Sequence, residues 1–451
     1  MMSVETVGVL GLVCLFVMLA MRFSVALSMI IVGFFGTLLA TQQKMLALGL
    51  PAERAASQGW KTALSNLSGE TFEAASNYNL LVIPLFILMG NLAGVSGMSN
   101  GLFRAAYAFL GHLRGGLASA TIAGCAGFAA LSGSSLAAAV TMGRVALPEM
   151  RRFRYDDGLA TGAVAAGGTL GFLIPPSGGM IIYAILTEQS IGQLFMAGII
   201  PGILLSLLFI GVISLQVWRR PGLGPAGARS DLAEKRRALI GAAPITTVIG
   251  LTIAGMYTGF FTPVEASAFG AVLTFAIALA ERKLSWRKMH LVALQTMSAT
   301  STIFLILIGA FVFIPFMSLT EIPTRMVEFL TALPIGSLGI LAVVILVYIF
   351  LGTFLEGIAM LVLTLPVVMP IAAALGWDLV WFGIVVVIVL EMGMISPPVG
   401  INVFIVKSIA PDVPMLRIFA GIWPFWFAMI LMLVLLIVFP QIALFLPQTM
   451  F

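Results

Sequence analysis

An apolar run from about Leu159 to Leu186 contains the stretch Gly167-Gly168-Thr169-Leu170-Gly171-Phe172-Leu173-Ile174-Pro175-Pro176-Ser177-Gly178-Gly179. Pro176 has no amide hydrogen with which to continue a helix, and Pro175 disfavours the helical conformation at the residue before it. We therefore expect one helix to end at residue 173 or 174 and another to begin after residue 177. Backbone groups left unpaired at bilayer depth cost several kcal/mol each unless protein, water or a ligand satisfies them. The break is therefore a candidate binding site.

The chain repeats this interruption as Glu391-Met392-Gly393-Met394-Ile395-Ser396-Pro397-Pro398-Val399-Gly400, inside an apolar run from about Leu379 to Ile409. The offset is 397 − 175 = 222, and the same offset pairs Pro148 with Pro370, Gly171 with Gly393, Pro176 with Pro398 and Gly178 with Gly400. Interrupted segments at corresponding places in two halves are typical of the binding sites of secondary transporters. Two ordinary proline kinks are the alternative, which the shared register disfavours.

The composition places the chain among integral membrane proteins. It is 61% hydrophobic and only 9% charged, with a mean hydropathy of +1.13. Apolar runs of about 20 residues predict spanning helices and not the shorter strands of a barrel. The first run, from about Val7 to Met21, has no basic leader or cleavage pattern, so we interpret it as a retained helix. We expect an all-α polytopic membrane protein.

We predict two halves, residues 1–217 and 239–451, joined by a basic cytoplasmic linker at 218–238. Each half contains a helical hairpin followed by a broken helix. The hairpins cover about 115–150 and 335–375, and the broken helices about 158–187 and 379–409. Outside these segments we expect an outer-face loop at 42–77, interfacial helices at 100–112 and 320–333, and a final span at 421–446.

The first hairpin is expected to be re-entrant, with Leu131-Ser132-Gly133-Ser134-Ser135 at its tip. Only about 16 residues separate Gly115 from this tip, which is too few for a full span. Serines that let helices pack closely are the alternative. By the repeat, Gly352-Thr353-Phe354-Leu355-Glu356-Gly357 forms the tip of the second hairpin.

The distribution of basic residues predicts the orientation. With the N-terminus outside, 18 of the 23 Lys and Arg fall on one face and four on the other, and Arg144 lies within the first hairpin. The four are Lys44, Arg54, Lys61 and Arg325. This bias is the positive-inside pattern, and it accounts for the net charge of +5 without a nucleic-acid partner. The same threading makes the two broken helices run in opposite directions, so we predict an inverted repeat.

The breaks supply the chemistry of a cation site. Carbonyl oxygens at the end of the helix near Gly171 and Ile174 lose their partners and carry the negative end of the helix dipole. With the Ser132 hydroxyl they suit sodium, and by the repeat Gly393, Ser396, Gly352 and Thr353 form a second site. No other cofactor is expected.

The restarting helices and the second limbs of the hairpins point their N-termini at the same region, which favours an anion. Ser134, Ser135 and Ser177 can donate hydrogen bonds to a carboxylate. Glu356 and Glu391 are acidic residues within apolar runs, which is typical of functional groups. The alternative is a protonated or backbone-bonded carboxyl at either position. No HExxH, GxSxG or P-loop spacing occurs, so we expect a transporter and not an enzyme.

Two segments, residues 168–202 and Ser396-Pro397-Pro398-Val399-Gly400-Ile401-Asn402, are similar to signatures of a known family. The chain resembles the large membrane subunit of tripartite ATP-independent periplasmic (TRAP) transporters, the DctM-like permeases. The resemblance implies a sodium-driven elevator-type importer of the bacterial inner membrane. It implies cation ligands at Ser132, Gly171, Ile174 and Pro175, and at Gly352, Gly393 and Ser396. We add Pro397 to the second cation site. We also include Glu356 and Asn402 among the candidate substrate ligands.

The resemblance also implies partners. These are a small four-helix membrane subunit, expected as a separate polypeptide, and a periplasmic protein that captures an organic acid with a carboxylate. A stand-alone sodium/dicarboxylate symporter of similar fold is the alternative, and a scaffold protein without transport activity is a second one. Many family members have Asp and then Ser or Thr at the second hairpin tip, where this chain has Glu356-Gly357.

Overall fold

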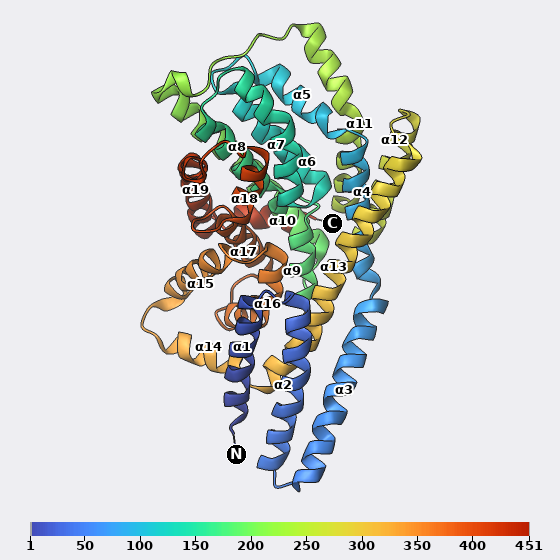
Figure 1. Ribbon diagram of the computed structural model, residues 1–451, viewed down its shortest axis with the longest axis vertical. Helices are drawn as coiled ribbons and strands as arrows, with labels where there is room; N and C mark the ends of the chain where they lie inside the picture. The colour runs from blue at the N-terminus through green and yellow to red at the C-terminus, as the bar shows by residue number, and fades with distance from the viewer. Residues whose placement is uncertain (1, 451) are drawn as a thin grey trace. The chain divides into compact units, whose positions relative to one another are not determined.

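The computed structural model describes residues 2–450, and all regular secondary structure in that range is helical (Figure 1). The residues form two compact units. Unit 1 comprises residues 2–81, Ser298–Val344 and Ile358–Asp378, and unit 2 comprises Val82–Met297, Ile345–Gly357 and residues 379–450. Each unit therefore draws on both predicted halves, and the predicted division at residues 218–238 stays a prediction.

Unit 1 holds the helices α1 Val4–Ala20, α2 Val25–Ala47, α3 Ala52–Ser76, η1 Tyr78–Leu81 and α14 Ile322–Ala332. Three helices contribute to both units: α13 Trp286–Leu319, α15 Gly336–Gly352 and α16 Gly357–Ala374. Unit 2 holds α4 Val82–Val95, α5 Ser99–Leu110, α6 Gly116–Ser132, α7 Ser135–Arg152, α8 Asp157–Leu173, α9 Gly178–Leu186, α10 Ile191–Arg219, η2 Pro221–Leu223, α11 Leu232–Tyr257, α12 Pro263–Ala280, α17 Leu379–Met394, α18 Ile401–Ile409, α19 Met415–Val438 and α20 Gln441–Gln448.

In unit 1, α2 packs between α1 and α3 (Figure 1). Gly33 permits a close approach to α13, because a Cβ there would lie 2.7 Å from the Val312 carbonyl oxygen. The Asn66 amide of α3 donates to the same carbonyl at 3.3 Å. Segment 52–76, which we expected as part of a loop, is thus a polar helix along α2. Its Ala, Glu, Leu and Lys residues have high helix propensity, which the low hydropathy of the segment obscured.

In unit 2, the core is formed by α8 and α17. Nearly every residue of both helices is buried, and α8 packs against α6, α7 and α19. The crossing with α19 depends on glycines, since a Cβ on Gly421 would lie 1.9 Å from the Gly158 carbonyl oxygen. A helix that is apolar on all sides belongs inside a helical protein, and these two helices lead into the breaks.

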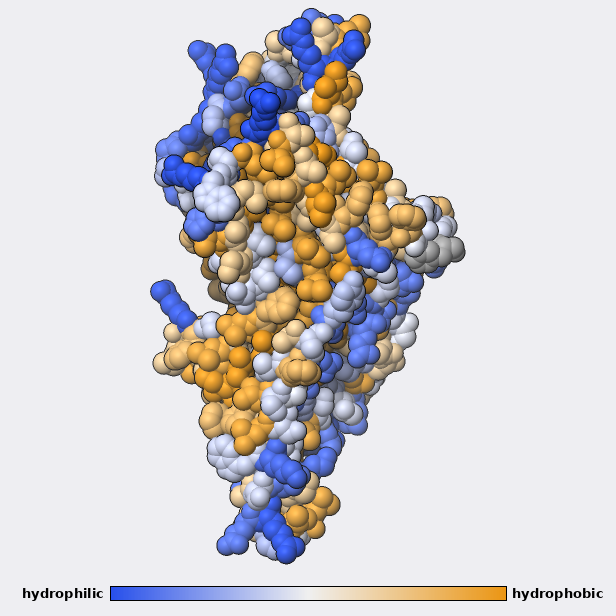
Figure 2. All heavy atoms as spheres, turned by 90° about the vertical axis from the view of Figure 1, so that its right-hand side faces the viewer, coloured by the Kyte–Doolittle hydropathy of each residue, from blue (hydrophilic) through white to orange (hydrophobic). Residues whose placement is uncertain are grey.

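Nine helical segments within residues 2–450 are long and apolar enough to span a membrane, and one of them is the broken pair α8 and α9. Figure 2 shows hydrophobic side chains over much of the face that it presents, as expected for side chains in contact with lipid. The last spanning helix ends earlier than predicted. Helix α19 stops at Val438, and Pro440 is the N-cap of the short helix α20. Pro440 has no amide hydrogen and disfavours the helical conformation at Phe439, so a continuous helix to residue 446 was the wrong prediction.

Candidate functional site

The first break lies where the sequence predicts it. Helix α8 ends at Leu173, Ile174 is extended, the Pro175–Pro176 peptide bond is cis, and Ser177 caps α9. The two prolines supply no amide to the carbonyl groups of Gly171 and Phe172, four residues before them. The Ser177 hydroxyl donates to the Phe172 carbonyl at 2.5 Å. The Gly171 carbonyl accepts no hydrogen bond from any described residue.

The tip of the first hairpin contacts this break directly. Gly133, in the left-handed conformation with φ +55°, separates α6 from α7. The Gly178 amide donates to the Gly133 carbonyl at 3.1 Å. A Cβ on Gly171 would lie 2.6 Å from the Ser134 carbonyl carbon. The Ser132 hydroxyl, at the end of α6, is buried and has no partner within residues 2–450.

The second tip and the second break make matching contacts. The Gly400 amide donates to the Thr353 carbonyl at 3.2 Å, and 400 − 222 = 178 gives the corresponding donor in the first half. A Cβ on Gly393 would lie 2.6 Å from the Gly352 Cα, and Gly393 corresponds to Gly171 by the same offset. In each half, therefore, a main-chain hydrogen bond and one glycine contact join a tip to a break.

The hydroxyls of the second candidate site already have partners. Ser396 donates to the Met392 carbonyl at 2.6 Å and accepts from the Trp426 indole at 2.9 Å. Thr353 donates to the Phe350 carbonyl at 2.8 Å. Unlike Gly171, Gly393 has its carbonyl bonded, to the Ser396 amide at 2.9 Å. Of the two candidate cation sites, the first therefore has more free oxygen ligands.

Sequence reasoning missed Trp426. The residue lies on α19, 30 positions beyond the serine that it contacts. The aromatic cluster Trp423-Pro424-Phe425-Trp426 within an apolar span was the only available signal.

The candidate substrate ligands have separate surroundings. Ser134 and Ser177 accept hydrogen bonds from the Ala137 and Met180 amides and so cap α7 and α9. Asn402, at the start of α18, is fully buried, and both polar atoms of its amide lack a partner in the described chain. Glu356 precedes Gly357, where a Cβ would lie 3.1 Å from the Phe172 ring. The second tip therefore reaches the first break.

The Ser135 hydroxyl donates to the carboxylate of Glu391, which is only 1% exposed. This contact joins the first residue of α7 to α17, across 256 positions of sequence. In this conformation Ser135 is therefore occupied by a side chain of the protein.

Ion pairs link the helix ends that lie away from the breaks. Arg151, on α7, contacts Asp412 at 2.7 Å and Asp157 at 3.6 Å, and Arg417 contacts Asp156 at 2.6 Å. The hydrogen bond from Arg151 lowers the pKa of Asp412 below its usual range. These contacts join α7 to the segment before α19 and the start of α8 to the first turn of α19.

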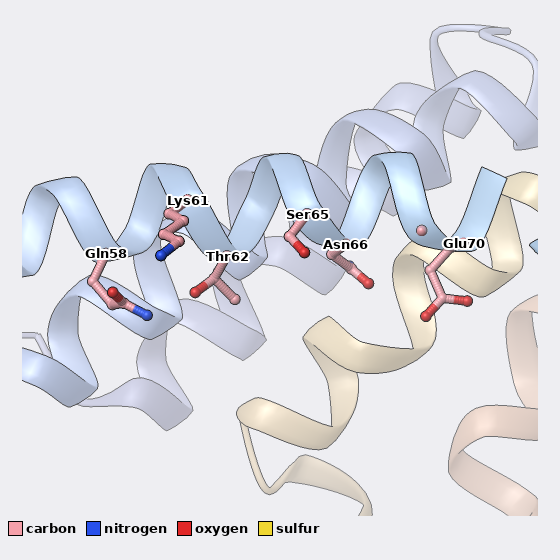
Figure 3. A pocket seen from close by; sticks show the side chains of 7 residues that line it. Gln58, Lys61, Thr62, Ser65, Asn66 and Glu70 are labelled. Carbon is pink, nitrogen blue, oxygen red and sulfur yellow. The ribbon is translucent and has the colours of Figure 1, made fainter. Parts of the chain in front are cut away.

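A separate polar groove of about 440 Å³ lies on α3. Figure 3 shows its side chains in a row along one face of that helix, without convergence on a point. The lining residues are Gln58, Lys61, Thr62, Ser65, Asn66, Gly69 and Glu70. None of them belongs to the predicted sites.

The family model of the tripartite ATP-independent periplasmic transporter, DctM component, matches residues 12–442. The chain belongs to this family. It is 35% identical over 389 residues to the C4-dicarboxylate TRAP transporter large permease protein DctM of Pseudomonas aeruginosa, covering 86% of this chain and 90% of that protein. It is 31% identical to the sialic acid TRAP transporter large permease protein SiaM of Vibrio cholerae, covering 85% and 91%.

Solved structures of low sequence identity share the fold of this DctM-family chain. The YdaH transporter of Alcanivorax borkumensis aligns with a TM-score of 0.59 at 14% identity, over 86% of this chain and 90% of that one. MtrF of Neisseria gonorrhoeae aligns with a TM-score of 0.55, also at 14% identity, over 84% of each chain. The predicted family and the all-α fold class are confirmed. The DctM-family chain is a transporter permease component of the inner membrane and not an enzyme.

Proposed function

We propose that this large permease subunit imports an organic acid by sodium symport. The supporting observation is the pair of tip-to-break contacts, with the Gly171 carbonyl and the Ser132 hydroxyl left unpartnered at the first of them. Unwound carbonyls at the ends of half-helices are the usual sodium ligands of secondary transporters. A buried hydroxyl oxygen without a partner costs free energy unless a ligand fills its place.

Ser132, Gly171, Ile174 and Pro175 would hold one sodium ion. Gly352, Thr353, Gly393, Ser396 and Pro397 would hold the second. Oxygen atoms with negative partial charge favour a hard cation, and each ligand named here is uncharged. A bound ion would bridge a hairpin tip and the break that this tip already contacts. Sodium would therefore stabilise the arrangement in which tip and break are in contact.

The acid group of the substrate would bind near the N-termini of α7, α9 and α18, where free amides favour an anion. Candidate ligands are Ser134, Ser135, Ser177, Glu356 and Asn402. Asn402 is favoured because its buried amide has no partner in the described chain. The names of relatives refer to C4-dicarboxylates, sialic acid and isethionate, which supports an organic acid as the class of substrate.

TRAP permeases work with a small membrane subunit and a periplasmic binding protein. For this chain we propose a separate four-helix subunit and a binding protein that delivers the acid. We also propose an elevator mechanism, in which hairpins and broken helices move as one body. Both tips, both breaks and the first hairpin belong to unit 2, which supports a common body for these parts. The limbs of the second hairpin within Ser298–Val344 and Ile358–Asp378 belong to unit 1.

Transport by the reconstituted complex tests this proposal. Proteoliposomes containing the chain and its small subunit should take up labelled acid only with the binding protein and an inward sodium gradient. Replacing sodium with potassium on both sides is the control for ionic strength. Uptake that is unchanged in potassium contradicts symport, and uptake without the binding protein contradicts the tripartite assignment.

A further inference from the structure

Glu391 is a buried acidic side chain to which the proposed mechanism assigns no role. It lies in α17, is 1% exposed, and receives a hydrogen bond on Oε1 from the Ser135 hydroxyl. Its other oxygen, Oε2, is also buried and has no hydrogen-bond partner in the described chain. No described Lys, Arg or His lies within ion-pair distance of it. A buried carboxyl without a counter-charge ionises only at a high cost in free energy, so the ionised form of Glu391 requires a cation close to it.

The position of Glu391 relates it to both candidate cation sites. Along α17 it precedes Gly393, at the second break, by two residues. Through space it contacts Ser135, which follows Ser134, and the Ser134 carbonyl carbon lies against Gly171 of the first break. One carboxylate thus lies beside the last turn of α17 and the first turn of α7.

We propose that the Glu391 carboxylate is the counter-charge shared by the two candidate sodium sites, and that Ser135 positions it. This inference rests on the proposed sodium symport. Two cations held by neutral carbonyl oxygens in a site of low dielectric repel each other, and one carboxylate close to both reduces that repulsion. The bound ions in turn supply the positive charge that the buried carboxylate lacks.

Glu356 does not replace Glu391 in this role. It also interacts electrostatically with Glu391, but it lies on the tip between α15 and α16 and is only partly buried. The other charged residues of α7 and of the helices that pack on α7 or α17 each lie several residues along the chain from a tip or a break. They are Arg144, Glu149, Arg151, Arg152, Asp157, Arg219, Lys407 and Arg417. Glu391 is the fully buried acidic residue that contacts the first hairpin tip and also lies on the helix leading into the second break.

Sodium-dependent thermal stability tests the inference without a transport assay. The purified full-length chain in detergent is heated at increasing sodium chloride, with choline chloride keeping the ionic strength constant. A ligand that binds only the folded state raises the midpoint of unfolding, so the titration gives a half-saturating sodium concentration.

Three variants separate charge from geometry. Glu391→Gln keeps an acceptor oxygen for Ser135 but removes the charge, and should raise the half-saturating concentration by about tenfold or more. Ser135→Ala keeps the charge but frees the carboxylate, and should raise it by about threefold to fivefold. Glu149→Gln is the matched control, because Glu149 lies on α7 as Ser135 does and its side chain is 44% exposed. This substitution should change the half-saturating concentration by less than about twofold.

The outcomes distinguish this inference from the proposed function. If sodium does not stabilise the wild type more than choline does, sodium symport itself is contradicted. If sodium stabilises the wild type and Glu391→Gln has the same half-saturating concentration, the shared counter-charge is overturned while symport stands. If Glu391→Gln does not fold, Ser135→Ala decides by the same criterion, and an unchanged value there overturns the inference.

Discussion

Gly171 is the residue on which the first candidate site depends most directly. Even the smallest side chain there would meet the Ser134 carbonyl carbon at 2.6 Å. Main-chain atoms cannot rotate away as a flexible side chain can, so any substitution must separate the hairpin tip from the break.

We therefore expect Gly171→Ala to reduce sodium-driven uptake by about tenfold or more, since a displacement of about 1 Å at a binding site has effects of this size. Uptake of labelled acid by proteoliposomes is the measurement. Gly211→Ala is the control, because a Cβ at that glycine of α10 meets nothing within 4 Å. Equal uptake by the two variants would show that the first site does not lie at Gly171.

The indole of Trp426, on α19, donates a hydrogen bond to the Ser396 hydroxyl. Trp426→Phe removes that donor, and a lost hydrogen bond of about 1 kcal/mol should raise the half-saturating sodium concentration for uptake by about fivefold. Trp423→Phe is the matched control, since Trp423 contacts Trp426 edge to face, with ring centroids 5.4 Å apart, and is 43% exposed. A similar effect of both substitutions would assign the change to packing and not to Ser396.

Prediction from sequence succeeded where a main-chain feature depends on neighbouring residues in the chain. Pro175 and Pro176 remove the partners of carbonyls four residues before them, so the unpartnered Gly171 carbonyl followed from the sequence alone. The contact of Ser135 with Glu391 joins residues 256 positions apart. Neither that contact nor the one between Trp426 and Ser396 leaves a periodic signal, because both depend on tertiary packing.

Among the elements, helix ends were predicted where proline or glycine determines them. The end of α8 at Leu173 and the cap of α9 at Ser177 follow from Pro175 and Pro176. The same rule applied to Pro440 would have ended α19 near Val438. Helix α3 was missed because hydropathy identifies spans and not polar helices that pack on other helices.

The ion pair between Arg151 and Asp412 joins α7 to the segment after α18. Because the folded state lowers the pKa of Asp412, the folded protein binds fewer protons there than the unfolded chain does. The contribution of this carboxylate to stability is therefore fully present above its ordinary pKa of 3.8 and is lost as the pH falls through the lower folded-state value.

Asp412→Asn should lower the midpoint of thermal unfolding slightly near neutral pH, by no more than about 2 °C, because the pair is solvent-exposed. The difference from the wild type should shrink as the pH falls below 3.8 and should vanish once the carboxylate is protonated in the folded state as well. Midpoints measured near neutral pH and in acid check the sign. A difference that grows in acid would mean that the aspartate stabilises the fold when protonated.

At the scale of the whole molecule, charge asymmetry predicts which surface faces the cytoplasm. The basic linker contains Arg219, Arg220 and Arg229, whereas the other face carries few basic residues. Ala228 of the basic linker is exposed, and so is Ser57 on α3. The two positions allow the orientation to be tested directly.

With Cys14 and Cys125 replaced by serine, a membrane-impermeant maleimide should label Ala228→Cys only in inside-out vesicles. Ser57→Cys should be labelled only in right-side-out vesicles, because residues 42–77 are predicted on the outer face. Mass spectrometry of labelled protein is the readout. Labelling of both positions from the same side would contradict the predicted threading.

The hydrogen bonds from Gly178 to Gly133 and from Gly400 to Thr353 use main-chain atoms alone. Substitution of neighbouring side chains therefore leaves these two hydrogen bonds intact. Residues such as Asn402 can be exchanged for others while the frame that presents them is preserved. Redesign of such a permease for a new cargo should accordingly begin with side chains beside these hydrogen bonds, and should leave Gly133, Gly178 and Gly400 unchanged.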